Sequence, residues 1–179
     1  MNKQVGNFLQ KVGIMPTIKC ARLHMRKFTQ DDWPDYFSYI SNRQVMKYIG
    51  DGALNEEQAR KKFKRVLRVN EAKYAYGFYG AWNLENNVFI GLAKFDYIER
   101  GKAEVGYALL PEYWGQGYAS EMLNGMVNYG KHLMGVKELY GLIDPMNPRS
   151  QRVLVRLGFE LHERGFFDEK RTDYYKLNI

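Results

Sequence analysis

The chain has 179 residues, of which 45% are hydrophobic and 26% charged, and 27 Lys and Arg against 20 Asp and Glu give it a formal net charge of +7. No apolar run approaches the ~20 residues that cross a bilayer, and Met1–Lys11 lacks the apolar core of a secretion signal, which predicts a cytoplasmic protein that binds no membrane. Cys20 is the only cysteine, which excludes an intrachain disulfide and a cysteine-based zinc site.

The first half of the chain reads as strands interrupted by two helices. Thr29 is the expected N-cap of the first helix, because acidic residues follow it in the first turn. Asn86-Asn87 and Arg100-Gly101-Lys102 are the turns between later strands, which favours an antiparallel meander. The predicted strands are Ala21–Lys27, Tyr74–Trp82, Val88–Ile98 and Ala103–Leu110.

The second predicted helix, residues 56–69, carries many of the basic side chains. Asn55 and Gln58 resemble an N-terminal capping pair, and Ala59 and Phe63 begin its apolar face. The basic residues of this helix then point mostly outward. Their outer face is either a solvated polar face or a surface that binds nucleic acid or the ribosome. We expect the first, with nucleic acid met only through a ribosomal substrate.

The run Tyr113–Glu121 joins two closely spaced glycines to an amphipathic pattern over 118–133. Apolar side chains recur there at spacings of three and four, which predicts a helix that starts at the glycines. The first N–H groups of a helix have no intrahelical partner, and its dipole is positive at that end. Gly115–Gly117, called the glycine turn below, is therefore either a plain strand-to-helix connector or a cradle for a phosphate or pyrophosphate.

The last part of the chain predicts a crossover and a closing hairpin. Asn147 suits an N-cap, Pro148 suits the first helical position, and Gly158 suits the end of that helix. The remaining predicted strands are Val136–Ile143, Phe159–Arg164 and Lys170–Leu177. The order predicts an α+β or mixed α/β fold in one domain over residues 1–179, with residues 1–17 as a peripheral or flexible segment.

Three segments together resemble the GCN5-related N-acetyltransferases. Arg22-Leu23-His24-Met25-Arg26 is similar to the opening of the branch that acetylates protein N-termini, typified by the ribosomal-protein alanine acetyltransferases. Glu104–Tyr107 with Trp114–Glu121 is similar to its cofactor segment, and Asn147-Pro148-Arg149-Ser150 is similar to its second signature. Their order and spacing along most of the chain make the combination specific.

The resemblance implies a twisted mixed sheet, flanked by helices, whose two central strands splay apart around acetyl-coenzyme A. It implies pantetheine pairing with the backbone of Ala108, Leu109 and Leu110, and a pantetheine amide contact from Asn147. Trp114 stands where the family pattern has Gln or Arg, which removes one cationic contact from the cofactor loop. The residues implied to hold the pyrophosphate are Trp114, Gly115, Gln116, Gly117, Tyr118, Ala119 and Ser120.

The implied reaction is direct attack of a neutral amine on the thioester, so the amine must lose a proton. At pH 7 this costs about 1.4 kcal/mol for an α-amine of pKa ~8 and about 4.6 kcal/mol for a lysine of pKa ~10.4. Glu104 is the expected base, directly or through water, unless it serves a structural hydrogen bond or faces solvent. Ser150, which also contacts the cofactor, is the expected donor to the sulfur, because Leu154 stands where many family members have tyrosine.

Other residues are alternatives for parts of this chemistry. Asn147 and Ser150 also fit simple roles in the first turn of a helix, and Tyr174 and Tyr175 are alternative donors in a strand. The three histidines show no ligand spacing, so no metal is expected.

We therefore predict an acetyl-coenzyme A dependent N-acetyltransferase, monomeric or homodimeric. Its predicted acceptor is a protein N-terminal α-amine such as that of a ribosomal protein. The alternatives are a small-molecule amine acetyltransferase and a non-catalytic module that binds coenzyme A or RNA.

Overall fold

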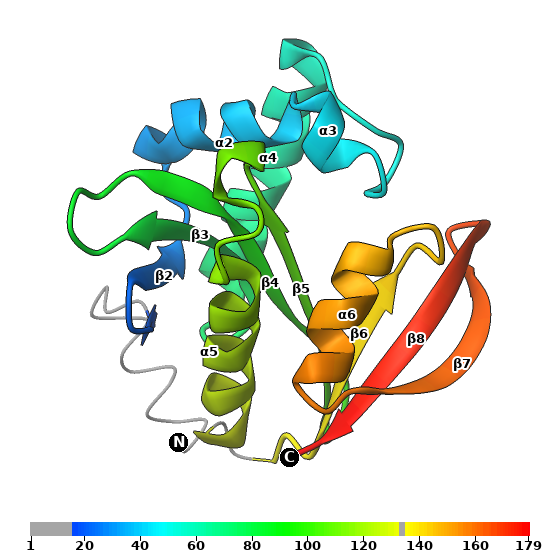
Figure 1. The fold of residues 1–179 in the computed structure, drawn as a ribbon. Helices are drawn as coiled ribbons and strands as arrows, with labels where there is room; N and C mark the ends of the chain where they lie inside the picture. The colour runs from blue at the N-terminus through cyan, green and yellow to red at the C-terminus, as the bar shows by residue number, and fades with distance from the viewer. Residues whose placement is uncertain (1–15, 133–134) are drawn as a thin grey trace.

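A computed structural model describes residues 16–132 and 135–179, and within these ranges eight strands form one sheet (Figure 1). Their order across the sheet is β1-β2-β3-β4-β5-β6-β8-β7. The strands are β1 (Thr17–Lys19), β2 (Leu23–Lys27), β3 (Gly77–Asn83), β4 (Phe89–Glu99), β5 (Lys102–Leu109), β6 (Glu138–Ile143), β7 (Glu160–Phe167) and β8 (Lys170–Asn178). No helix in these ranges is long and apolar enough to cross a membrane.

Two helices begin at their predicted capping residues, whereas the predicted cap Thr29 precedes a 3-10 turn at Gln30–Asp32 that leads into the first α-helix, whose own N-cap is Asp32. At the second predicted helix, Asn55 Oδ1 accepts from the Gln58 N–H at 2.9 Å and Gln58 Oε1 accepts from the Asn55 N–H at 3.1 Å, which confirms the capping pair. Asn147 Oδ1 likewise accepts from the Ser150 N–H at 3.2 Å. The helices are η1 (Gln30–Asp32), α2 (Trp33–Ile40), α3 (Arg43–Met46), α4 (Glu56–Ala72), η2 (Pro111–Tyr113), α5 (Tyr118–His132) and α6 (Pro148–Arg156).

The antiparallel meander is confirmed for β2 to β5. β2 and β3 begin at Leu23 and Gly77, slightly later than the predicted starts at Ala21 and Tyr74. β1 was not predicted, because three residues are too few to show a period, and it pairs with β2 from Thr17 to Lys19. The single-turn α3 was missed for the same reason. The prediction for residues 1–17 falls mainly on residues 1–15, which lie outside the described residues, as does Leu133 of the predicted helical pattern.

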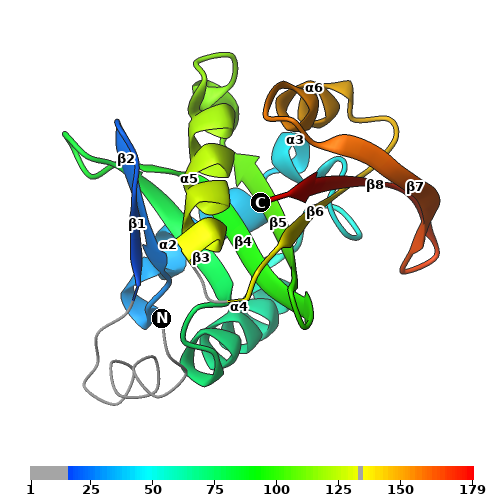
Figure 2. The ribbon, with the colours of Figure 1, turned by 90° about the horizontal axis from the view of Figure 1, so that it is seen from below.

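The sheet carries a separate core on each face. On one face, α5 packs Met122, Leu123 and Met126 against the central strands. On the other face, α2 and α4 pack Tyr36 and Phe63 against Trp82, Phe89, Leu92 and Ala108. Figure 2 shows α5 and α6 on one side of the sheet and α4 on the other. Both faces of the central strands are therefore covered by helices.

The one parallel pairing of the sheet is short. β5 and β6 pair only at Lys102 with Glu138, Ala103 with Leu139, and Glu104 with Tyr140, after which they separate. Beyond that point β6 continues beside β8 and β5 beside β4, so the two halves of the sheet open from each other (Figure 1). This β5/β6 divergence confirms the predicted mixed sheet with splayed central strands.

Candidate active site

The site begins at Glu104, the last residue of β5 that pairs with β6. Side chains alternate along a strand, and Ala103 and Val105 belong to the core under α5, so Glu104 faces the side of α2 and α4. Its Oε2 lies 2.7 Å from Lys94 Nζ, and the two side chains are only 18% and 25% exposed. The predicted base is therefore half-buried and held in place by an ion pair across two strands.

Ser150 lies on the other face, where a tyrosine of β5 meets it. The Tyr107 hydroxyl donates to Ser150 Oγ at 3.3 Å. Burial raises the pKa of Tyr107, while the hydrogen bond with Ser150 opposes the rise, so its phenol stays protonated at neutral pH. Sequence reasoning missed this pair. The available signal was the alternation of β5, which puts Tyr107 on the face opposite Glu104.

Close packing of α6 on β6 brings Ser150 to this point. A Cβ on Gly141 would lie 2.8 Å from Leu154 Cδ2, closer than real Cβ contacts, so glycine lets the helix approach the strand. Leu154 is 2% exposed and serves the core in place of a tyrosine. Gly141 thus leaves room for the Leu154 side chain where α6 packs on β6.

The glycine turn has the geometry of an anion cradle. Gly115 and Gly117 have φ of +74° and +84°, a region that favours glycine. The Glu121 N–H donates to Gly117 O at 3.1 Å, so the N–H groups of Tyr118, Ala119 and Ser120 precede the first intrahelical bond of α5. A Cβ on Gly115 would meet nothing within 4 Å, which leaves open space beside the turn. These donors fit the diphosphate of coenzyme A.

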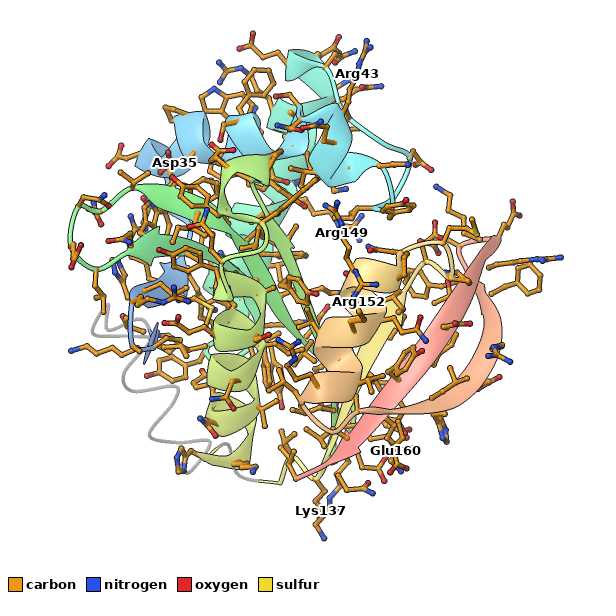
Figure 3. The ribbon with its side chains drawn as sticks, in the orientation of Figure 1. Asp35, Arg43, Lys137, Arg149, Arg152 and Glu160 are labelled. Atoms are coloured by element: carbon orange, nitrogen blue, oxygen red, sulfur yellow. The ribbon has the colours of Figure 1, made fainter. Side chains whose placement is uncertain are left out.

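Two side chains fix the approach to this turn. Trp114 Nε1 donates to Leu109 O at 2.8 Å, which ties the turn to the end of β5. The Arg149 guanidinium lies 5.1 Å from the centre of a Trp114 ring. Figure 3 shows Arg149 at the upper end of α6, level with the glycine turn at the upper end of α5. The position occupied by Trp114 thus has a cation beside it, supplied from another element.

The end of β5 presents its backbone groups in two directions. The Leu110 N–H donates to Ile90 O at 3.0 Å and so points to β4, and the alternation of an antiparallel ladder turns the Leu109 groups away from β4. Of the predicted pantetheine contacts, the Leu110 N–H is already used within the sheet, and the same alternation turns the backbone groups of Ala108 toward Leu92 of β4. The Leu109 N–H remains directed toward the β5/β6 divergence.

The alternative candidates have structural roles. Tyr174 donates its hydroxyl to Phe166 O at 2.9 Å within the closing hairpin, and Tyr175 is 2% exposed in the core. Burial, with a smaller effect from the charge of Glu121, raises the pKa of Cys20 to about 11, so its thiol is inert at neutral pH. In the described ranges, no group of three or more His, Cys, Asp or Glu side chains is arranged to hold a metal ion.

Residues 22–160 match the family model described as an acetyltransferase (GNAT) domain. The chain belongs to the GNAT family. It is an acetyl-coenzyme A dependent N-acetyltransferase, as the names of its relatives also indicate. The resemblance drawn from the three sequence segments is thereby confirmed.

Three relatives illustrate the likeness. The uncharacterised N-acetyltransferase YnaD of Bacillus subtilis is 30% identical over 150 residues, which cover 84% of this chain and 85% of that protein. The [ribosomal protein uS5]-alanine N-acetyltransferase of Escherichia coli is 30% identical over 101 residues, 54% of this chain and 52% of that protein. A GNAT-family acetyltransferase structure from Bacillus anthracis aligns with a TM-score of 0.77 at 27% identity, covering 92% and 98% of the two chains.

Proposed function

We propose that this enzyme acetylates the α-amino group of a protein N-terminus, such as that of a ribosomal protein, in the cytoplasm. The observation that carries the proposal is the placement of Glu104 on one face of the β5/β6 divergence and of the Tyr107–Ser150 pair on the other. Acetyl-coenzyme A supplies an activated acetyl group as a thioester. The chain then needs one group to take a proton from the amine and one to give a proton to the departing sulfur.

The cofactor side of the proposal uses the face that carries α5 and α6. The N–H groups of Tyr118, Ala119 and Ser120 would hold the diphosphate, with Arg149 adding positive charge nearby. The Leu109 N–H and the Asn147 side chain would bind the pantetheine arm. Together these groups would direct the thioester toward Ser150.

On the opposite face, Glu104 would accept a proton from the amine directly or through one water molecule. The ion pair with Lys94 orients the Glu104 carboxylate. An α-amine of pKa ~8 gives up its proton at a cost of about 1.4 kcal/mol at pH 7, against about 4.6 kcal/mol for a lysine side chain. A single paired carboxylate suits the weaker demand of the α-amine.

Tyr107 and Ser150 would supply the proton that the departing sulfur takes. Tyr107 donates to Ser150, so a proton passed from the serine hydroxyl to the sulfur can be replaced from the phenol. Burial raises the pKa of Tyr107, so the phenol is protonated at the pH of the reaction. In this proposal Tyr107 of β5 serves as the tyrosine that many family members have at the position of Leu154, and Leu154 packs in the core.

The charges on the Glu104 face favour an acceptor with one amine over a polyamine. Glu104 pairs with Lys94, Glu138 with Lys176 at 2.9 Å, and Asp96 with Lys73 at 2.9 Å. A polyamine would have to displace these lysines to reach their carboxylates. An extended N-terminal peptide needs recognition of one amine only, and the net charge of +7 adds repulsion against a polycation.

The test is an acceptor screen that follows free thiol release from acetyl-coenzyme A. Purified enzyme is given peptides with free N-termini, the same peptides with blocked N-termini and an internal lysine, and spermidine. We expect release only with free N-termini. Preference for spermidine would replace the proposed acceptor with a small amine, and absence of release with every amine would favour a non-catalytic binding module.

A further inference from the structure

The turn before β2 reaches across to the glycine turn through one arginine. Arg22 donates from its backbone N–H to Glu121 Oε1 at 2.6 Å and from Nε to Glu121 Oε2 at 2.7 Å. Its Nη1 donates to the Gln116 carbonyl at 3.1 Å, and its guanidinium lies 4.2 Å from the centre of the Tyr118 ring. One residue thus contacts three positions of the turn and of the first turn of α5.

The contact with Gln116 has a directional consequence. A trans peptide is planar, so its C=O and the following N–H point in opposite directions. Because the Gln116 carbonyl is turned to Arg22, the N–H of Gly117 is turned away from Arg22. This peptide joins Gln116 to Gly117, and Gly117, at a φ of +84°, is a residue whose backbone rotates freely. Arg22 therefore holds a peptide that the flexibility of Gly117 would otherwise leave free to turn.

The contact with Glu121 has an electrostatic consequence. Glu121 is 15% exposed on its side chain and lies in the first turn of α5, where its negative charge would oppose a bound diphosphate. Arg22 satisfies both carboxylate oxygens with N–H donors, which neutralises this charge while keeping the carboxylate as an anchor. A Cβ on Gly117 would lie 3.4 Å from Arg22 Nη2, so the guanidinium also lines the turn itself.

We propose that Arg22 and Glu121 form a clamp that holds the glycine turn in its diphosphate-binding shape before coenzyme A arrives. Arg22 is a positioning residue for the cofactor, and its effect is on preorganisation. The inference rests on the proposed placement of the diphosphate at the glycine turn. It predicts a loss confined to the diphosphate part of the cofactor.

The test measures the affinities of coenzyme A and of pantetheine, which lacks the diphosphate, by calorimetry. We expect Arg22→Gln and Glu121→Gln each to weaken coenzyme A binding about tenfold or more and to leave pantetheine binding unchanged. Arg22→Lys keeps the charge but loses the planar fork, so we expect it to resemble Arg22→Gln. Arg60→Gln is the matched control, because Arg60 is a similarly exposed arginine paired with Glu56 at 2.6 Å.

Three results would overturn the clamp: equal loss for both ligands, no loss for either, or full rescue by Arg22→Lys. A further variant, Gly117→Ala, separates the clamp from the site on which it rests. If Gly117→Ala weakens coenzyme A binding and Arg22→Gln does not, the clamp alone fails. If neither variant changes the affinity, the glycine turn is not the diphosphate site and the placement of the cofactor fails with it.

Discussion

The hydroxyl of Tyr107 donates to Ser150 Oγ at 3.3 Å, and this contact joins β5 to α6 where the two halves of the sheet have parted. The sequence alone does not show that these two side chains meet, since they are 43 positions apart. They meet where β5 and β6 have separated and where α6 packs on β6 beside Gly141. It places two hydrogen-bonded hydroxyl groups on the face opposite Glu104.

The first prediction concerns this pair. Tyr107→Phe and Ser150→Ala should each lower kcat for thiol release, by about tenfold or more, because general acid catalysis typically contributes 10²–10⁴ and water replaces part of it. The double variant should be little worse than the worse single one, because the two hydroxyls act in series. Tyr174→Phe is the control, since its hydroxyl serves the hairpin. Additive losses would contradict a relay.

The second prediction concerns Glu104, the proposed base. Glu104→Gln keeps the shape of the side chain and removes its ability to accept a proton, so kcat/KM should fall by about 10²-fold at pH 7. The loss should shrink as pH rises toward ~8 and above, because more of the α-amine is then already neutral. Glu138→Gln removes a carboxylate from the same face and should change kcat/KM little. A loss independent of pH would show that Glu104 is structural.

The capping pair of α4 and the N-cap of α6 could be predicted, because Asn55 with Gln58 and Asn147 with Ser150 are three residues apart. Such signals depend on local backbone geometry alone. The glycine turn was predictable for the same reason. The ion pair of Glu104 with Lys94 needed the β4/β5 register, and the contact of Arg22 with Glu121 joins residues 99 positions apart. Long-range pairings of this kind cannot be derived from periodicity or spacing.

The third prediction tests the local signal at α4. Asn55→Ala removes the acceptor for the Gln58 N–H and should lower the free energy of unfolding by about 1 kcal/mol, with a range of roughly 0.5–2. Urea denaturation of both proteins measures the difference. Asn55→Asp retains the acceptor and should keep most of the stability. Equal stability of Asn55→Ala and the original protein would mean that packing of Phe63 and Val66 alone holds the start of the helix.

The fourth prediction concerns a buried lysine beneath α4. Lys27 is 2% exposed, and its Nζ donates to the backbone carbonyls of Asn70, at 2.9 Å, and of Lys73 at the end of that helix. Burial, and to a lesser extent the charge of Lys73, together lower its pKa from 10.5 to about 8. The ammonium form is therefore disfavoured in the folded protein relative to the unfolded chain.

The sign of the pH dependence follows from proton binding. Between pH 8 and 10.5 the unfolded chain holds the Lys27 proton more tightly than the folded protein, so stability rises with pH in that window and is constant with respect to this group below it. Relative to Lys27→Met, which does not titrate, the original protein should gain roughly 2 kcal/mol between pH 7 and 9.5, at ~1.36 kcal/mol per pH unit above the folded pKa. Urea denaturation of both proteins across this range measures the gain, and because the raised-pKa tyrosines are common to both, they cancel in the comparison. Parallel stability curves for the two proteins would mean that Lys27 keeps its ordinary pKa, which would require the two carbonyls at the end of α4 to offset the whole effect of burial.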